Sequence, residues 1–386
     1  MDIILDLFAP IIEQMQADPM LIVKQIVMWI IGGVLIYLAI KKEMEPTLLL
    51  PMGFGAILVN LPGIEMVGGE AVAQNGAFHT LERLFQIGID NGELMPLILF
   101  IGIGAMIDFG PLLRNPKYML FGAAAQFGIF FTLCLASFVG FDLNDAASIA
   151  IIGAADGPTA IFVAQTLNSG YLAAIMVAAY SYMALVPLIQ PVVIKACTTK
   201  KERLIRMDDS GARDVSKTTR ILFPIIVTII VGFVAPDADS LIGFLMFGNL
   251  IRECGVLNSL SETAQKVLAN LITIFLGITI AFQMKAGEFL RWETLLIMGL
   301  GLFAFIFDTF GGIMIAKIMN LFLKNKINPM IGAAGISAFP MAGRVVNKMG
   351  LAEDDQNFLL MHAIGVNVSG QVASVIAGGL ILSFLA

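Results

Sequence analysis

The sequence contains few charged residues for its length. Only 13% of its 386 residues are charged and 58% are hydrophobic, whereas an average soluble domain has roughly 25% charged residues. The mean hydropathy is +0.89. This composition excludes an ordinary soluble globular protein and predicts an integral membrane protein, with apolar stretches long enough to span a bilayer along the whole chain. Any function must therefore lie within the helical bundle.

Cysteine and histidine are also scarce. The three cysteines lie far apart without a CxxC spacing, and the two histidines are isolated. We therefore expect neither a disulfide framework nor a metal centre built from these residues. The net charge is −6, and no basic run is interleaved with aromatic residues. This absence excludes nucleic-acid binding.

The N-terminal segment 1–20 is acidic and begins "MDIILDLFAP". It lacks the basic start and the small-residue cleavage site of a signal peptide, so we expect it to remain as an amphipathic surface segment.

Apolar runs predict about ten membrane-spanning helices and two interrupted stretches. The helices are expected near 21–40, 44–62, 93–108, 118–140, 170–195, 221–236, 240–254, 264–283, 294–318 and 357–385. The interrupted stretches are 146–168, which contains "IIGAADGPTAIFVAQ", and 327–345, "INPMIGAAGISAFPMAGRV". Glycine, proline and polar residues in the middle of each stretch predict broken helices.

The basic residues predict how these two stretches cross the membrane, because cytoplasmic loops hold most lysine and arginine. The most basic loop is 195–220, and it falls on the same side as the other basic loops only if 146–168 and 327–345 are re-entrant. The sequence thus predicts an all-α integral membrane protein with two inverted repeats. We expect a first membrane repeat at 21–196, a basic cytoplasmic linker at 197–220 and a second, inverted repeat at 221–386.

Asp156 lies at the break of the first re-entrant stretch, followed by Gly157 and Pro158. A lone aspartate at bilayer depth costs about 2.5 to 3.5 kcal/mol, so it needs a partner or a function. With the hydroxyl of Thr159 and freed backbone carbonyls, it offers the oxygen ligands that a hard cation prefers. The structural alternative is that Asp156 only caps the second half-helix. Asp308 is a second intramembrane acid, which could equally make a hydrogen bond between helices.

The helix that follows each broken stretch is expected to line the same cavity, because inverted repeats place ion sites near the midplane. Alignment of 171–194 with 358–381 sets Tyr180, Ser181 and Tyr182 opposite Asn367 and Ser369. Ser374 and Ser337 are weaker candidates. Close packing of small residues and interhelical hydrogen bonds are the structural alternatives for these positions.

Enzyme motifs are absent elsewhere. "GARDVSKT" at 211–218 lacks the second glycine of a phosphate loop, and Lys285 in "QMKAG" lies between helices and not in a small β-domain. We expect no nucleotide chemistry and no biotin attached to this chain.

Four long motifs nevertheless identify a family. "GFGAILVNLPG", "GAADGPTAIFVAQ", "NPMIGAAGISAFPMAGRV" and "FLLMHAIGVNVSGQVASVIAGG" closely resemble the β subunit of the sodium-pumping, biotin-dependent decarboxylases, which act on oxaloacetate, methylmalonyl-CoA, glutaconyl-CoA or malonate. The resemblance covers nearly the whole chain. It implies that carboxybiotin carried by a partner subunit is decarboxylated at this membrane subunit, consuming a proton, while sodium moves outward.

The resemblance also implies site residues and partners. Asp156 would bind sodium and be coupled to the proton, with Tyr182 and hydroxyl-bearing residues of the last helix contributing. Asp156 and Tyr182 are the predicted catalytic residues. The predicted sodium-binding set is Asp156, Thr159, Tyr182, Asn367, Ser369 and Ser374, where Ser369 and Ser374 are alternative registers of one position. The implied partners are a carboxyltransferase α subunit, a biotin carrier and a small membrane subunit of γ or δ type, in a bacterial or archaeal cell membrane. A homo-oligomer is left open.

The alternative function is a sodium-coupled secondary transporter, either a carboxylate symporter or a sodium/proton antiporter. It would share the inverted repeats and the midplane acid. A passive membrane anchor is disfavoured, because an anchor needs neither two helix breaks nor buried acids.

Overall fold

The protein is helical throughout most of the part that its computed structural model describes, which is residues 18–43, 46–61, 64–67, 70–73, 76–90, 94–207 and 215–385. Most of the predicted N-terminal segment 1–20 lies outside these residues. Seven described helices are long and apolar enough to cross a membrane, or eight if one bent pair is counted as a single span. The all-α membrane fold is thus confirmed, apart from one short β-ribbon.

The described chain forms two compact units, and each draws on both halves of the sequence. Unit 1 comprises Met1–Pro96 and Asn270–Leu296, and unit 2 comprises Leu97–Ala269 and Ile297–Ala386. Unit 1 holds α2 (Pro19–Lys41), α3 (Pro46–Val59), β1 (Ile64–Val67), β2 (Glu70–Ala73), α4 (Gly76–Phe85), the π-helix η1 (Gln86–Asp90), most of α16 (Ala269–Ile280), η6 (Ala281–Gln283) and α17 (Ala286–Phe289). Strands β1 and β2 pair antiparallel, with Ile64 opposite Ala73.

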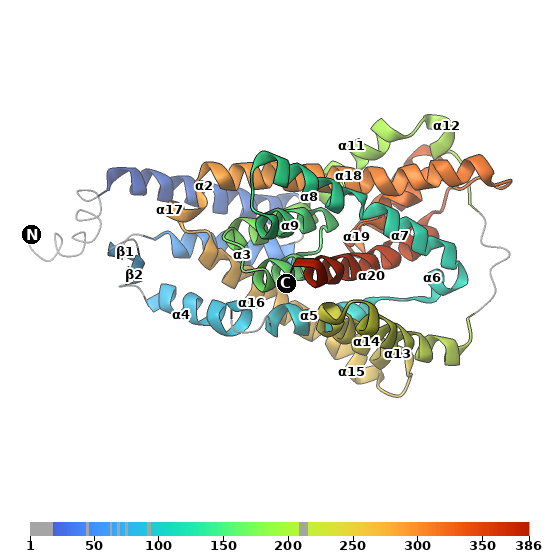
Figure 1. Ribbon diagram of the computed structural model, residues 1–386, viewed down its shortest axis with the longest axis horizontal. Helices are drawn as coiled ribbons and strands as arrows, with labels where there is room; N and C mark the ends of the chain where they lie inside the picture. The colour runs from blue at the N-terminus through green and yellow to red at the C-terminus, as the bar shows by residue number, and fades with distance from the viewer. Residues whose placement is uncertain are drawn as a thin grey trace, which may run out of the picture. The chain divides into compact units, whose positions relative to one another are not determined.

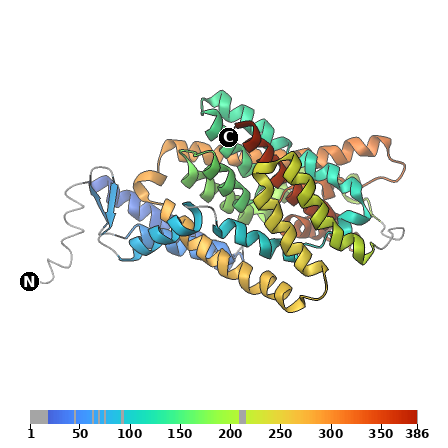
Figure 2. The same ribbon diagram turned by 60° about the horizontal axis from the view of Figure 1, so that its bottom comes forward.

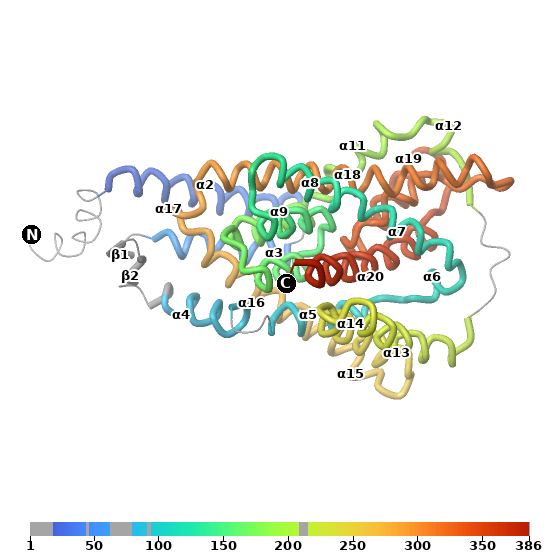
Figure 3. Tube along the Cα trace, viewed as in Figure 1, coloured from blue at the N-terminus to red at the C-terminus, as the bar shows by residue number. Residues whose placement is uncertain are grey.

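Unit 2 holds the remaining helices. They are α5 (Leu94–Met106) and α18 (Trp292–Phe322), which both begin in unit 1, and α6 (Gly110–Arg114), η2 (Pro116–Tyr118), α7 (Met119–Ala125), α8 (Phe127–Val139), α9 (Leu143–Ala150), η3 (Ile151–Ala154), α10 (Gly157–Thr166), α11 (Leu172–Cys197), α12 (Lys200–Arg203), α13 (Lys217–Val234), η4 (Pro236–Ala238), α14 (Asp239–Glu253), α15 (Asn258–Glu262), the π-helix η5 (Thr263–Leu268), η7 (Pro329–Gly335), α19 (Met341–Glu353) and α20 (Leu360–Leu385). Helix α20 packs against α6, α7, α10 and α19 (Figure 1). Helices α13 and α14 lie side by side (Figures 2 and 3).

Three of the ten expected spans are shorter than a membrane crossing requires. Helix α3 has 14 residues, α5 has 13 and α14 has 15, whereas a crossing needs roughly 17 to 25. Asn60 directly follows the end of helix α3. Its side-chain amide donates to the carbonyls of Ala56 and Met284, both at 2.8 Å. Its oxygen accepts the Ala286 N–H at 2.7 Å. The expected number of ten spans is therefore not confirmed.

Close backbone packing holds the helices of unit 2 together. A Cβ atom on Gly104 of α5 would lie 1.8 Å from the Leu245 carbonyl oxygen of α14, and one on Gly248 of α14 would lie 2.1 Å from the Ile101 carbonyl oxygen of α5. Only glycine permits these approaches. Small residues at helix contacts are typical of membrane bundles, where van der Waals packing replaces the hydrophobic drive to associate.

The first interrupted stretch consists of α9, η3 and α10, with its break at Ala155 and Asp156. Ala155 has a left-handed backbone (φ 53°) and Asp156 an extended one. The two ends of the stretch meet. Asp145 in the first turn of α9 accepts hydrogen bonds from the Ser169 hydroxyl (2.7 Å) and the Gly170 N–H (3.0 Å), both of which follow α10. The chain therefore turns back to the place where the stretch began.

The second interrupted stretch, η7 and α19, returns in the same manner. Asn328 directly before η7 and Asn357 after α19 both donate to the carbonyl oxygen of Arg203, each at 2.9 Å. The two stretches meet at their breaks, where the Ser337 N–H donates to the Ala154 carbonyl at 3.0 Å. Chain reversal at both stretches is what re-entrant segments require. The inverted repeat and the membrane path remain predictions.

Candidate functional site

The candidate site is centred on the carboxylate of Asp156. The residue occupies the N-cap position of α10, with Pro158 in the first turn, but its side chain makes no capping hydrogen bond. Only 4% of Asp156 is exposed. The left-handed turn at Ala155 ends the 3₁₀-helix η3 and redirects the chain, at a cost of about 1 to 2 kcal/mol for a residue with a Cβ. Capping of α10 and binding of a cation remain the two predicted roles of Asp156.

Three side chains converge on one oxygen of this carboxylate. The Thr159 hydroxyl donates to Oδ2 at 2.7 Å, the Gln371 amide at 2.9 Å and the Ser374 hydroxyl at 3.4 Å. Thr159 lies in the first turn of α10, whereas Gln371 and Ser374 lie on α20, 215 and 218 positions after Asp156. The site is therefore built where the first interrupted stretch contacts the last helix.

The three side chains that donate to Asp156 are polar and uncharged. Thr159 and Ser374 are fully buried, and Gln371 is 2% exposed. A buried ionised carboxylate is costly unless it is hydrogen-bonded and paired with a cation. Within the described ranges, no three acidic, histidine or cysteine residues are grouped as a multivalent metal would require. One carboxylate with neutral oxygen-bearing neighbours suits a cation of single charge.

The two tyrosines of α11 occupy different places. The Tyr182 hydroxyl donates to the carbonyl of Met298 in α18 and not to Asp156. The ring of Tyr180 lies against Gly157, the first residue of α10, where an added Cβ would come within 2.4 Å of the ring. The Tyr180 hydroxyl is buried and has no hydrogen-bond partner among the described residues. Tyr180 and Tyr182 are two positions apart, which is about 200° around a helix. Only one of the two side chains can therefore face α10.

The other predicted residues of α20 contact different elements. The Asn367 amide donates to the Ile336 carbonyl of the second break at 2.7 Å. The Ser369 hydroxyl donates to the Tyr118 carbonyl at 2.8 Å. The side chain of Ser337 makes a long hydrogen bond, 3.4 Å, from its hydroxyl to the Gly370 carbonyl. Of the two alternative registers, the structure places Ser374 beside Asp156 and Ser369 beside η2.

Asp308 on α18 makes the hydrogen bond between helices that was one of its two expected roles. Its Oδ1 accepts the N–H of Ile129 in α8 at 3.0 Å. Its Oδ2 is buried without a hydrogen-bond partner in the described part of the chain. A Cβ on Gly153 of η3 would lie 2.9 Å from this oxygen. Asp308 therefore packs directly against the first interrupted stretch.

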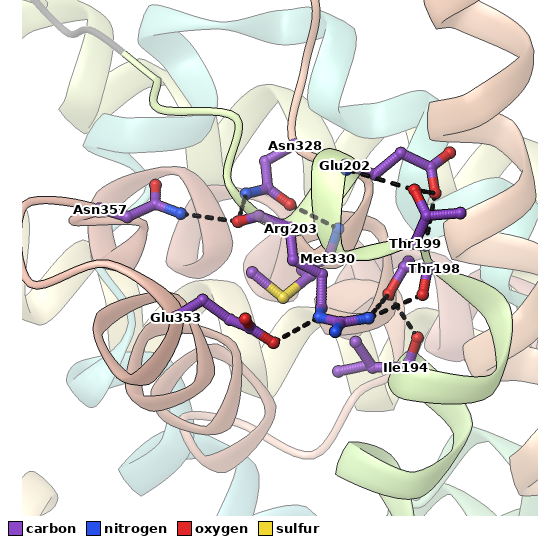
Figure 4. Close-up of polar contacts among 9 residues, drawn as sticks. All are labelled: Ile194, Thr198, Thr199, Glu202, Arg203, Asn328, Met330, Glu353 and Asn357. Carbon is purple, nitrogen blue, oxygen red and sulfur yellow. Dashed lines mark hydrogen bonds and ion pairs between the residues drawn. The ribbon is translucent and has the colours of Figure 1, made fainter.

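A polar network ties the basic linker to the second interrupted stretch (Figure 4). The Arg203 guanidinium donates to Glu353 at 2.6 Å and to the Thr198 carbonyl at 2.7 Å. The Asn328 amide also donates to the Ile205 carbonyl at 2.8 Å, while its oxygen accepts the Met330 N–H. Thr199 and Glu202 form a capping box for α12. The linker thereby holds both ends of the second stretch.

The structure thus brings together three of the six predicted sodium-site residues: Asp156, Thr159 and Ser374. It adds Gln371, which the sequence analysis missed. A signal was present, because Gln371 lies three positions before Ser374 in "NVSGQVAS" and residues at i and i+3 share a helix face. An amide in an otherwise apolar helix is the same type of signal that selected Asn367.

Comparison with known proteins agrees with the resemblance in the motifs. A family model described as "Na+-transporting oxaloacetate decarboxylase beta subunit" matches residues 24–385. The chain is 49% identical over 375 residues to the methylmalonyl-CoA decarboxylase subunit beta of Propionigenium modestum, which covers 93% of this chain and 94% of that protein.

Two further relatives have similar coverage. The chain is 44% identical over 414 aligned positions to the oxaloacetate decarboxylase beta chain of Klebsiella pneumoniae, with 94% and 95% of the two chains covered. It is 47% identical over 359 residues to the methylmalonyl-CoA decarboxylase subunit beta of Veillonella parvula, with 93% and 92% covered. The secondary-transporter alternative is not favoured. The chain belongs to the family of β subunits of the sodium-transporting decarboxylases and is the membrane subunit of such a complex.

Proposed function

We propose that this chain decarboxylates carboxybiotin supplied by a partner subunit and couples the release of carbon dioxide to outward sodium transport. The observation that carries the proposal is the convergence of Thr159, Gln371 and Ser374 on the buried carboxylate of Asp156. This carboxylate lies beside the contact between the two interrupted stretches, where the Ser337 N–H donates to the Ala154 carbonyl. In transporters with inverted repeats, ion sites occur at such breaks.

In this proposal Asp156 supplies the negative ligand of the sodium ion. The hydroxyl oxygens of Thr159 and Ser374 supply neutral ligands. Gln371 donates its amide to Asp156, and rotation of that amide by 180° would turn its oxygen toward the carboxylate as a further ligand. A hard cation is bound by oxygen ligands of this kind. Tyr182 and Asn367 remain sequence-based candidates for the site, and their described hydrogen bonds are made to Met298 and Ile336.

The transport step requires an energy source and two arrangements of the bundle. Moving one charge against 100 mV costs about 2.3 kcal/mol. We propose that sodium at Asp156 and carboxybiotin together favour one arrangement, and that loss of carbon dioxide with proton uptake favours the other. The partners in this scheme are a carboxyltransferase, a biotin carrier and a small membrane subunit, as the resemblance implies.

The proposal is tested with the complete complex in proteoliposomes. The biotin carrier is loaded with a ¹⁴C-labelled carboxyl group, and release of ¹⁴CO₂ is measured against sodium concentration together with movement of ²²Na. We expect sodium to stimulate the release and ²²Na to move only while carbon dioxide is released. Movement of ²²Na by this chain alone, driven by a proton or carboxylate gradient and independent of ¹⁴CO₂ release, would contradict the proposal and support a secondary transporter.

A further inference from the structure

Tyr180 on α11 carries a hydroxyl that packing alone does not explain. Only 1% of the residue is exposed, and its hydroxyl has no hydrogen-bond partner among the described residues. Burial takes a hydroxyl away from water, so it destabilises the fold unless another group shares a hydrogen bond with it. A phenylalanine ring would fill the same space without this cost. The buried hydroxyl therefore points to a partner that the described part of the chain does not supply.

The phenol end of this side chain lies at the first break. A Cβ on Gly157 would come within 2.4 Å of Cε1 and Cζ of the ring and 2.7 Å of Cε2, which are the three ring carbons nearest the hydroxyl. Gly157 directly follows Asp156. The Tyr180 hydroxyl and the Asp156 carboxylate interact electrostatically, and no hydrogen bond joins them within the described ranges. Glycine at position 157 thus permits the phenol oxygen to lie near the carboxylate.

Tyr182 faces a different element. Its hydroxyl donates to the Met298 carbonyl of α18, and a Cβ on Gly301 of the same helix would lie 3.0 Å from its ring. The oxygen of Tyr182 is therefore engaged by α18. The resemblance in the motifs implied a role for Tyr182 at the sodium site, whereas the structure brings the ring of Tyr180 to the break.

We propose that the hydroxyl oxygen of Tyr180 is a ligand of the sodium ion held by Asp156, and that Tyr180 and not Tyr182 is the tyrosine of this site. This inference rests on the proposed function. A phenol oxygen has lone pairs that can face a cation, and a hard cation takes neutral oxygen ligands beside a carboxylate. Ligation of the ion gives the buried hydroxyl the partner that the described residues do not provide. The contact of the ring with Gly157 fixes the position of that oxygen.

A ligand on α11 links the ion to a third helix. Thr159 lies on α10, and Gln371 and Ser374 lie on α20. Helix α11 packs against α10, and its Gln190 donates to the Ala333 carbonyl of the second interrupted stretch. Sodium that contacts α11 as well as α10 and α20 would stabilise the arrangement in which these three helices meet, as the coupling of ion binding to the bundle requires.

The test measures equilibrium binding of ²²Na to the complete complex without turnover, together with thermal unfolding in sodium-free buffer. Tyr180→Phe keeps the ring and removes the oxygen. We expect it to raise the dissociation constant for ²²Na by roughly tenfold, because one contact with a charged group is lost, while the unfolding temperature without sodium does not fall. The matched control is Tyr171→Phe, which removes a hydroxyl at the start of the same helix, beside Phe141. It should stay within about twofold of the unmodified complex.

The outcomes separate this inference from the proposed function. If Asp156→Asn binds ²²Na as tightly as the unmodified complex does, the sodium site of the proposed function is wrong and Tyr180 has no ion to bind. If Asp156→Asn loses binding and Tyr180→Phe behaves as Tyr171→Phe does, the sodium site stands and Tyr180 is not a ligand. A Tyr180→Phe complex with a lower maximal rate of ¹⁴CO₂ release but unchanged ²²Na affinity would also overturn the inference.

A second variant tests the position of the oxygen. Gly157→Ala adds the Cβ that would lie 2.4 Å from the ring of Tyr180, so it must displace the phenol and should weaken ²²Na binding. In the Tyr180→Phe background the same change should weaken binding less, because the oxygen that it displaces is already absent. Equal effects in both backgrounds would contradict the proposed ligand. Should Tyr180→Phe not assemble, Tyr180→Leu removes the same oxygen, and an unchanged ²²Na affinity in that variant would overturn the inference.

Discussion

The two interrupted stretches of unit 2 share a plan and differ in chemistry. Each turns back so that its ends meet, and each contacts the other at its break through Ser337 and Ala154. The first stretch carries a carboxylate at its break, and its ends are joined by its own residue, Asp145. The second has no acid at its break, and its ends are held by the Arg203 carbonyl of the linker.

This difference indicates a division of roles. The first stretch supplies the charge, and the helix that follows the second stretch supplies the donors Gln371 and Ser374. In the opposite direction, Gln190 of α11, the helix after the first stretch, donates to the Ala333 carbonyl of the second at 2.7 Å. Each half therefore completes the break of the other. An ion bound at Asp156 would therefore lie next to residues from both halves of the sequence.

The largest expected effect follows from removing the charge of the first break. Asp156→Asn should lower sodium-stimulated ¹⁴CO₂ release by roughly 100-fold or more, because removing one partner of a buried charge interaction costs about 3 to 5 kcal/mol. The control is Asp308→Asn, whose remaining amide oxygen can still accept from Ile129. It should leave the half-saturating sodium concentration within about twofold. Equal losses in both variants would show that Asp156 has no special relation to sodium.

The second prediction concerns the donors that α20 brings to the first break. Gln371→Leu replaces the amide side chain by an apolar one of similar size, so the half-saturating sodium concentration should rise about tenfold, the equivalent of one or two hydrogen bonds. Ser369→Ala is the matched control, because Ser369 contacts Tyr118. Its sodium activation curve should overlay that of the unmodified complex. A shift in Ser369→Ala without one in Gln371→Leu would favour the other register of α20.

The third prediction separates the tyrosines of α11. Tyr182→Phe removes the hydrogen bond to Met298, so it should lower the free energy of unfolding by about 1 kcal/mol and move the sodium curve less than Gln371→Leu does. Tyr180→Phe removes a buried hydroxyl without a hydrogen-bond partner in the described chain and should leave thermal stability unchanged or higher. Thermal unfolding and sodium activation curves of both variants give the answer. A sodium shift in Tyr182→Phe with unaltered stability would restore the role predicted from the sequence.

The smallest effect is expected where the second stretch ends, beside the linker residue Arg206. Hydrogen bonding from the Arg206 guanidinium lowers the pKa of the Asp354 carboxyl, through contacts of 2.6 and 2.9 Å. A group whose pKa is lowered by folding stabilises the fold above its ordinary pKa, about 3.9, and this contribution is lost as the pH falls through the lowered value.

Thermal unfolding of the complex between pH 7 and pH 3 tests this expectation. Asp354→Asn should be slightly less stable at pH 7, and the difference from the unmodified complex should become smaller toward the acid end. Asp355→Asn, its neighbour, serves as the control. A difference that grows toward low pH would contradict the assigned pair.

The sequence by itself determined the membrane class, the helical fold and the positions of both breaks. These features depend on local chemistry: an apolar composition cannot remain in water, and glycine, proline and polar residues that stand together weaken a helix at that place. It also determined that Asp156 needs a partner, because an unpaired carboxylate in an apolar segment is costly in any arrangement.

Only the tertiary structure decided which residues meet Asp156. Helix α20 is buried on most of its surface, so no polar stripe in the sequence indicates how it is rotated toward α10. Its rotation follows from close packing at particular glycines, such as Gly378 against Thr159 and Gly370 against Gly335. That packing turns Gln371 and Ser374 toward the carboxylate and Ser369 away from it, because a helix carries residues two positions apart on nearly opposite faces.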